Sequence, residues 1–216
     1  NTFTQDVLIS QPPEIIITPG DISDYNGYGV SCFGETDGYI NISSVSGGTG
    51  ALSISWDGPA GFTSADQNIS GLEAGGYMLT VTDELGCSEI YEVVLTEPDE
   101  LIIDFTVYMA SCPDVADGSI EIEVSGGVPP CTFLWNDGAT TEDRSSIMSG
   151  SYTLQVTDVN GCSDQAEINV DFNGENCLVV PEVITPGVVD GKNDFLVIRN
   201  IGLYPDAEIK IFNRWG

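Results

Sequence analysis

The chain has 216 residues, with 34 Asp and Glu against 5 Lys and Arg, no histidine, and a formal net charge of −29. So acidic a body repels nucleic acid and anionic lipid, and the lack of histidine excludes Ser-His, Cys-His and histidine-metal chemistry. No apolar run approaches the ~18 residues that a membrane-spanning helix needs. We therefore expect a folded acidic protein that is not an enzyme and has no direct membrane insertion.

The sequence repeats itself along the chain. "SCFGETDGYI" (31–40) returns as "SCPDVADGSI" (111–120), and "VTDELGC" (81–87) returns as "VTDVNGC" (156–162). Repetition at a fixed spacing indicates tandem structural units.

The chain start fits the same pattern, because "VLISQPPEI" (7–15) resembles "VVLTEPDEL" (93–101). We therefore expect residues 1–12 to be the last strand of a preceding repeat. Residues 13–98 and 99–174 then form two full repeats, and residues 175–216 form a separate segment.

Apolar residues alternate with polar ones in each repeat. The alternating positions include Ile40 and Ile42, then Tyr77, Leu79 and Val81, and their counterparts in the second copy. This spacing is typical of strands with one buried and one exposed face. It predicts an all-β fold of tandem immunoglobulin-like antiparallel β-sandwiches, with the paired Trp and Tyr residues in the cores.

The repeated cysteines predict two disulfides within the repeats. Cys32 and Cys87 each precede a strand, and Cys112 and Cys162 repeat the arrangement. If the first and last strands of a sandwich run parallel side by side, their starting ends are neighbours. We therefore expect Cys32–Cys87 and Cys112–Cys162 pairs, which suit an oxidising extracytoplasmic setting.

Two further cysteines leave alternatives open. Cys131 falls at an inward strand position, which favours a buried thiol, and Cys177 lies after the second repeat. A Cys131–Cys177 bridge is the other interpretation. Zinc has little support, since the chain has neither histidine nor a C-x-x-C pair.

Aspartates flank the repeated cysteines, and they have two interpretations. If the predicted disulfides form, Asp37 and Asp83 of the first repeat lie near one end of its sandwich, as do Asp117 and Asp158 of the second. Oxygen clusters of this kind suit Ca²⁺, the one candidate ion; no other cofactor is expected. Ordinary turn chemistry, in which a carboxylate accepts backbone N–H bonds, is the favoured alternative.

The last segment has a different composition. Residues 181–216 hold four of the five basic residues, and the sequence predicts three strands, Val179–Ile184, Asp194–Ile201 and Ala207–Asn213. Three strands make an incomplete sandwich.

These motifs resemble two known families. The tandem "SCFGETDGYI…SWDG…VTDELGC" pattern resembles the SprB repeat of Bacteroidetes cell-surface proteins. The segment "VPEVITPGVVDGKNDFLVI…YPDAEIKIFNRWG" is similar to the first part of the gliding-motility-associated C-terminal domain, the type B sorting domain of the type IX secretion system.

The resemblance implies a protein exported across the outer membrane and displayed on the cell surface or secreted. Its expected partners are the type IX secretion translocon and an outer-membrane β-barrel of the PorP/SprF class. The candidate recognition residues that match the sorting-domain pattern are Asp190, Asn193, Asp194, Asn213, Arg214 and Trp215.

We expect a non-enzymatic adhesin or stalk segment linked to gliding motility. The alternative is a set of carbohydrate-binding or spacer modules of a secreted hydrolase. A glycan or another surface ligand would then be the target, with Tyr25, Tyr28 and Phe62 in loops as the candidate aromatic platform.

Overall fold

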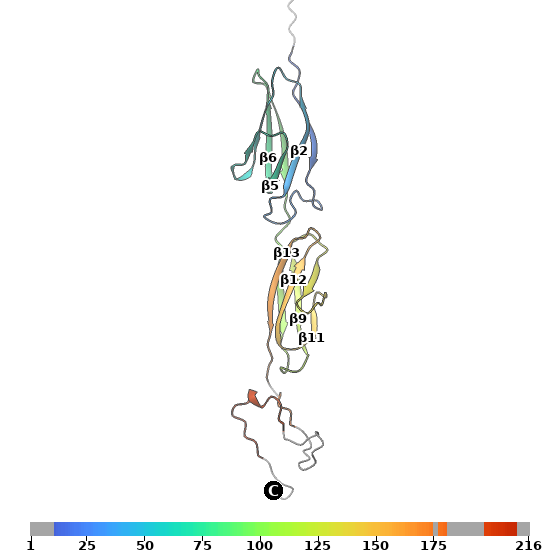
Figure 1. Ribbon diagram of the computed structural model, residues 1–216, viewed down its shortest axis with the longest axis vertical. Coiled ribbons are helices and arrows are strands. Elements are labelled where there is room, and N and C mark those ends of the chain that lie inside the picture. Colours follow the sequence, from blue (N-terminus) through green and yellow to red (C-terminus); the bar gives the residue numbers. More distant parts are fainter. Residues whose placement is uncertain (1–10, 175–176, 181–196, 211–216) are drawn as a thin grey trace, which may run out of the picture. The chain divides into compact units, whose positions relative to one another are not determined.

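The structure is a computed structural model that describes residues 11–174, 177–180 and 197–210. Figure 1 shows the chain with its strands labelled. The first repeat contains β1 (Ile16–Ile22), β2 (Gly38–Ser46), β3 (Ser53–Asp57), β4 (Thr63–Ser64), β5 (Ile69–Leu72), β6 (Gly75–Thr82) and β7 (Ser88–Leu95). The second repeat contains β8 (Ile102–Tyr108), β9 (Gly118–Ser125), β10 (Thr132–Trp135), β11 (Arg144–Ile147), β12 (Gly150–Thr157) and β13 (Ser163–Val170). Two single-turn 3₁₀ helices are η1 (Pro59–Gly61) and η2 (Ile201–Leu203).

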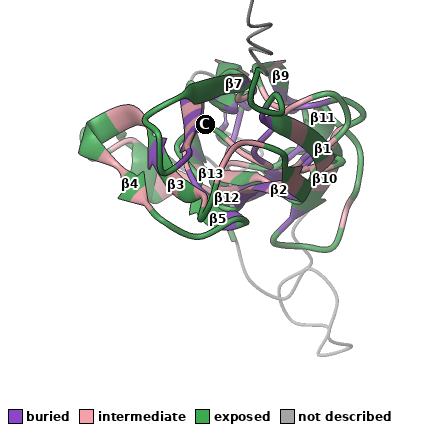
Figure 2. Ribbon diagram, turned by 90° about the horizontal axis from the view of Figure 1, so that it is seen from above, coloured by how far each residue is buried: buried purple, intermediate pink, exposed green. Residues whose placement is uncertain are grey.

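The first repeat is a sandwich of two antiparallel sheets. One sheet has the order β1-β2-β5 and the other has the order β4-β3-β6-β7. Burial alternates over the first five residues of β2, because residues at every second position face the opposite sheet. Figure 2 colours the ribbon by how far each residue is buried. The predicted all-β antiparallel fold is confirmed.

The core of this sandwich draws side chains from both sheets. Trp56 of β3 is fully buried and donates its indole N–H to the carbonyl of Asp66 at 3.1 Å. Around it lie Ile40 and Ile42 of β2 and Tyr77 and Leu79 of β6. These are positions at which the sequence predicted core residues.

The second repeat follows the same plan. Its sheets have the orders β11-β9-β8 and β10-β12-β13, so each of its strands has a counterpart in the first repeat. Trp135 is buried like Trp56, and its indole N–H bonds the carbonyl of Thr141 at 2.8 Å. The first repeat differs by the added β4 and η1.

The described residues fall into two compact units. The first unit contains residues up to 103 together with 124–132 and 156–164; the second contains 104–123, 133–155 and the described residues from 165 onward. Two turns that belong in sequence to the second repeat are therefore part of the first unit. One of them carries Cys162.

The direction of the strands decides which loops can meet. Gly38, where β2 begins, lies against Leu95, where β7 ends: a Cβ placed on Gly38 would be 2.8 Å from the Leu95 side chain. The second repeat repeats this arrangement, because Gly118 at the start of β9 lies against Val170 at the end of β13. The loop before β2 is thus at the opposite end of its sandwich from the turn before β7.

The described part of the last segment contains little regular structure. Residues 197–210 contain η2 and one isolated bridge, between Val179 and Arg199, but no strand. The predicted strand over 207–213 is therefore wrong in its described part, 207–210. The N–H of Ala207 bonds the carbonyl of Tyr204 at 3.0 Å in a turn that contains Pro205, so the chain turns where the strand was predicted to begin.

Candidate functional site

Each "VTDxxGC" turn is organised by its aspartate. One oxygen of Asp83 accepts the N–H groups of Leu85 and Cys87, and the other accepts that of Thr49, all at 2.9 Å. Asp158 accepts the N–H groups of Asn160, Cys162 and Val128 in the same way, at 2.8 to 2.9 Å. The carboxylate therefore fixes the backbone that carries the cysteine.

The Ser-Cys loops are held by a second aspartate. Asp37 accepts the N–H of Ser31 at 3.0 Å, and Asp117 accepts that of Ser111 at 2.8 Å. Burial raises the pKa of Asp37, but the hydrogen bonds from Ser31 outweigh this effect, and the net pKa lies below the ordinary value. Hydrogen bonds from Ser111 likewise lower the pKa of Asp117.

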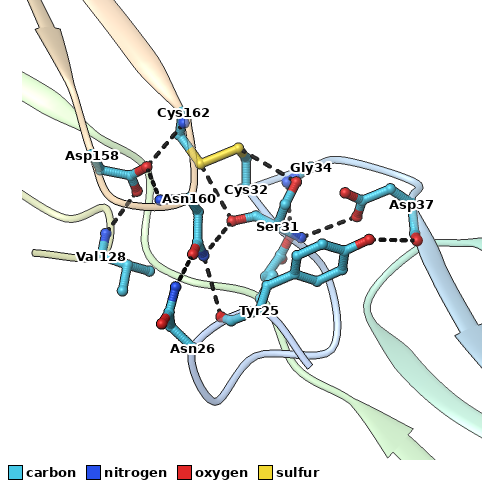
Figure 3. Close-up of a disulfide and its surroundings, with 11 residues drawn as sticks. Tyr25, Asn26, Ser31, Cys32, Gly34, Asp37, Val128, Asp158, Asn160 and Cys162 are labelled. Carbon is cyan, nitrogen blue, oxygen red and sulfur yellow. Dashed lines mark hydrogen bonds between the residues drawn. A yellow bond between two sulfur atoms is a disulfide. The ribbon is translucent and has the colours of Figure 1, made fainter. Parts of the chain in front are cut away.

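A disulfide joins Cys32 in the first of these loops to Cys162 in the second of these turns, with an S–S distance of 2.05 Å (Figure 3). Beside it, the amide of Asn160 donates to the carbonyl of Ser31 at 3.0 Å and to that of Tyr25 at 3.2 Å. Asn26 donates in turn to the side-chain oxygen of Asn160. The bond is thus supported by a polar network within the first compact unit.

A second disulfide joins Cys112 to Cys177. In both bridges the cysteine that bonds to the Ser-Cys loop also lies near the serine carbonyl of that loop. Cys177 Sγ is 3.1 Å from Ser111 O, and Cys162 Sγ is 3.3 Å from Ser31 O. The N–H of Cys177 donates to the hydroxyl of Tyr204, and Asn200 donates to the Cys177 carbonyl.

The predicted Cys32–Cys87 and Cys112–Cys162 pairs are wrong. They assumed that the Ser-Cys loop begins the first strand of a sandwich, but β1 and β8 precede these loops. The loop therefore lies at the end where β7 or β13 finishes, and its cysteine bonds one beyond its own repeat: Cys32 bonds Cys162 in the turn between β12 and β13, and Cys112 bonds Cys177 after β13. Cys87 is exposed and in neither bridge.

The Cys131–Cys177 alternative is also wrong, because Cys177 bonds Cys112. Cys131 belongs to neither bridge and is partly buried rather than fully buried.

The four candidate calcium residues serve as backbone anchors. Asp37 and Asp83 do not share an end of the first sandwich, because the disulfides that would have brought them together differ. Asp37 lies instead in the disulfide region with Asp158 (Figure 3). Within the described ranges, no group of three or more Cys, Asp or Glu is placed to hold a metal ion. The calcium site stays a prediction.

The Asp83 turn predicts a pH dependence. The Cys87 N–H, with help from other backbone donors, lowers the pKa of Asp83 below its ordinary value of 3.8. A lowered folded-state pKa contributes stability that is present above 3.8 and is lost as the pH falls through the folded value. Asp83→Asn should therefore lower the melting temperature at pH 7, and the deficit should shrink below pH 3.8.

Glu89→Gln is the matched control, since it removes the same charge at an exposed position of β7. It should leave the melting temperature at pH 7 close to that of the wild type. A deficit for Asp83→Asn that stays constant from pH 7 to pH 2 would contradict the assignment.

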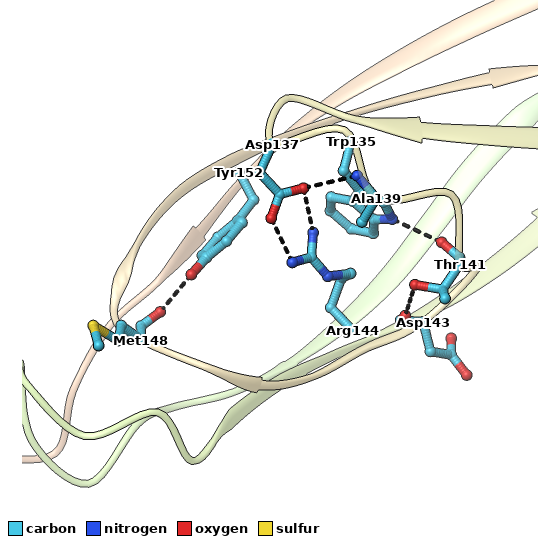
Figure 4. Close-up of polar contacts among 8 residues, drawn as sticks. All are labelled: Trp135, Asp137, Ala139, Thr141, Asp143, Arg144, Met148 and Tyr152. Atoms are coloured by element: carbon cyan, nitrogen blue, oxygen red, sulfur yellow. Dashed lines mark hydrogen bonds and ion pairs between the residues drawn. The ribbon is translucent and has the colours of Figure 1, made fainter.

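The second repeat contains one further polar cluster, around Arg144 (Figure 4). Its guanidinium donates to both oxygens of Asp137, at 3.0 and 2.6 Å. It also lies 5.2 Å from the Trp135 ring centre and 5.7 Å from that of Tyr152. The Arg144 hydrogen bonds hold the pKa of Asp137 below its ordinary value.

The first repeat has a different residue at the position of Arg144. Arg144 pairs with Ile120 as Ile69 pairs with Ile40, so the first repeat has an isoleucine where the second has the arginine. Arg144→Ala should lower the free energy of unfolding by about 2 kcal/mol, since two cation–π contacts and the packed stem are lost. Arg144→Ile should cost less. Chemical unfolding of both variants checks this, and equal losses would contradict it.

The candidate glycan platform is not assembled. Tyr25 and Tyr28 bond each other's backbone in a tight turn, and the Tyr25 hydroxyl donates to the carbonyl of Asp37 at 3.2 Å. Phe62 packs edge-on against the core residue Tyr77 at 5.6 Å. All three rings are partly buried.

The candidate recognition residues of the last segment lie outside the described residues. They are Asp190, Asn193, Asp194, Asn213, Arg214 and Trp215. Sequence reasoning did not identify Asn160 or Asn26, and it considered Cys177 only as a partner of Cys131, not of Cys112. A signal for Cys177 was present, because a cysteine follows each Ser-Cys loop after the end of its own repeat.

In the part of the chain that the structure describes, no helix combines the length and apolarity that crossing a membrane requires.

The fold and its bridges define a disulfide-bonded repeat protein. The family comparisons specify it further: the SprB repeat matches residues 30–61 and 110–140, and the CHU_C type IX secretion signal domain matches residues 178–216. The chain carries two SprB repeats and a type IX secretion signal domain, and it is a cell-surface protein secreted by the type IX system. No curated protein matches it.

Solved structures similar to the chain are immunoglobulin-domain proteins. A Dscam structure on isoform specificity shares 17% identity over 62% of this chain and 40% of its own, with a TM-score of 0.28. The amphioxus IgVJ-C2 molecule shares 14% identity over 56% of this chain and 88% of its own, with a TM-score of 0.29. The eight N-terminal Ig domains of DSCAM share 17% identity over 71% of this chain and 22% of their own, with a TM-score of 0.32. The chain thus spans well under two thirds of the first of these.

Proposed function

We propose that the chain is a non-enzymatic adhesin or stalk segment linked to gliding motility, delivered to the cell surface by residues 178–216. The observation that carries the proposal is the presence of SprB repeats and a type IX secretion signal in one chain. The two disulfides support it, because such bonds persist in an extracellular setting and strengthen domains with small cores.

A non-catalytic role is supported by the use of the polar residues. The buried carboxylates of Asp83 and Asp158 accept backbone N–H groups. The Arg144–Asp137 pair occupies a place that the first repeat fills with an isoleucine. These groups are thus engaged in holding turns and strands.

The partner of the last segment is the type IX translocon, with a PorP/SprF-like barrel as the surface anchor. The charge distribution supports a separate recognition role for this segment. It carries Lys192, Arg199, Lys210 and Arg214, whereas the rest of the chain carries Arg144 alone.

Deletion of residues 178–216 tests the proposal. The truncated protein should be retained inside the cell, whereas Cys87→Ser in the full chain should reach the surface normally. Surface protease accessibility on intact cells, with immunoblotting of cell fractions, measures both. Normal display of the truncated chain would refute the export role. If the full chain is displayed but cells that lack the whole protein glide and adhere as before, the adhesin role is refuted.

A further inference from the structure

The Cys32–Cys162 bridge joins a Ser-Cys loop, here called the donating half, to a "VTDxxGC" turn, here called the receiving half. The first repeat contains a "VTDxxGC" turn of its own, and so has a receiving half as well. Cys87 occupies the receiving position of the first repeat and is exposed. We propose that Cys87 forms a disulfide with the Ser-Cys loop of another SprB repeat, which makes the array a chain of covalently joined repeats.

The backbone at Cys87 is already set in the bonded form. Asp83 bonds the N–H of Cys87 at 2.9 Å, as Asp158 bonds that of Cys162 at 2.9 Å. The N–H of each aspartate bonds the carbonyl of its cysteine, at 2.9 Å in both turns. The receiving turn is therefore the same structure with and without its bond.

The surroundings also match. A cleft of about 400 Å³ beside the Cys32–Cys162 bond is lined on its receiving side by Glu100, Leu101, Gly161, Cys162, Ser163 and Asp164. The equivalent residues around Cys87 are Glu14, Ile15, Gly86, Cys87, Ser88 and Glu89. Each is identical or chemically similar to its counterpart.

The packing beneath these residues is equivalent as well. A Cβ placed on Gly47 would be 1.8 Å from the Glu14 carbonyl, and one placed on Gly126 would be 1.8 Å from the Glu100 carbonyl. Both glycines also have positive φ, of 85° and 69°. The backbone packing beneath the cysteine is thus the same in the two repeats.

The sequence before the first repeat identifies the occupant. Residues 7–15 resemble residues 93–101, which lead from the last strand of one repeat into the next. A donating repeat joined through this segment would stand to Cys87 as the first repeat stands to Cys162. One contact differs, because Leu85, which is 65% exposed, replaces Asn160 beside the incoming loop.

The bond forms by thiol oxidation. The S–H bonds of Cys87 and of the donating cysteine break, and one S–S bond forms. The two electrons and two protons pass to a disulfide oxidant, which leaves as two thiols; oxidised glutathione serves this purpose in vitro.

An extended chain tests the proposal directly. A copy of residues 13–92 is joined in front of residue 7, so that residues 7–12 replace the end of the copied repeat. After refolding with oxidised glutathione, alkylation of Cys87 by iodoacetamide should fall at least about tenfold relative to the unextended chain, since the tether raises the effective thiol concentration. Non-reducing digestion and mass spectrometry should recover a peptide linking Cys87 to the copied Cys32.

The copied repeat carries Cys87→Ser, so that the Cys87 peptide in the digest comes from residue 87 of the original repeat alone. As the control, Cys87→Ser in the original repeat as well should leave the copied Cys32 open to alkylation. Recovery of the Cys32–Cys162 and Cys112–Cys177 peptides reports correct folding. If the first extended chain does not fold, a second one is used, in which residues 99–167 are joined in front of residue 7. Unchanged alkylation of Cys87 in a folded extension, or its capture by any other cysteine, overturns the proposal. Neither outcome bears on surface export.

Discussion

Cys162→Ser should lower the free energy of unfolding under non-reducing conditions by about 5 kcal/mol. The bond that it removes spans 130 residues, and closing a loop of that length restricts the unfolded chain by about this amount on the chain-entropy model. Because Cys32 loses its partner as well, Cys32→Ser and the double variant should each show the same loss. Denaturant unfolding followed by tryptophan fluorescence measures the three variants.

Cys87→Ser is the matched control for this series. It changes the equivalent cysteine in the equivalent turn, yet this cysteine is exposed and in neither bridge, so its stability should stay within about 0.5 kcal/mol of the wild type. A reducing agent should bring the wild type down to the level of the Cys162 variant or lower, because it opens the second bridge too. A loss in Cys87→Ser equal to that in Cys162→Ser would contradict the observed pairing.

Trp56→Ala should lower the free energy of unfolding by about 3 to 5 kcal/mol, because a large, well-packed side chain is replaced by a cavity. Trp56 is fully buried between the sheets, and its indole N–H satisfies the carbonyl of Asp66. The expected fall in the melting temperature is about 10 °C for a chain of this size.

Phe33→Ala serves as the comparison, since its ring is 52% exposed in the Ser-Cys loop. Its melting temperature should change by no more than about 2 °C. A similar fall in both variants would show that aromatic area alone, rather than burial between the sheets, determines the loss.

The sequence predicted the sandwich class because alternation is a local property. In β2, for example, every second residue meets the opposite sheet, and the pattern can be read without knowing any partner strand. The cores around Trp56 and Trp135 follow from the same alternation. For this reason the repeat, its strands and its buried aromatic residues were predictable.

The disulfide pairing depends on strand direction, which is not local. The spacing of Cys32 and Cys87 is the same whether β1 precedes the Ser-Cys loop or not, but only its presence places Cys32 at the far end of the sandwich. The role of Asn160 was not predictable for the same reason, because the carbonyl groups to which its amide donates lie some 130 residues away in the sequence. Asp83 and Asp158 were identified as turn residues, since an aspartate two residues before an N–H is again a local signal.

The long span of the Cys32–Cys162 bond also has a mechanical consequence for a surface protein under tension. When the chain is stretched from its ends, the load passes from Cys32 to Cys162 through sulfur, and the residues between them carry none of it. Without this bond the load would run along the chain from Cys32 to Cys112 and cross to Cys177 through the second disulfide, so the bond withholds from extension a segment of about 80 residues that would reach about 270 Å if drawn out. Reduction of this single bond would convert a short, stiff element into a long, compliant one.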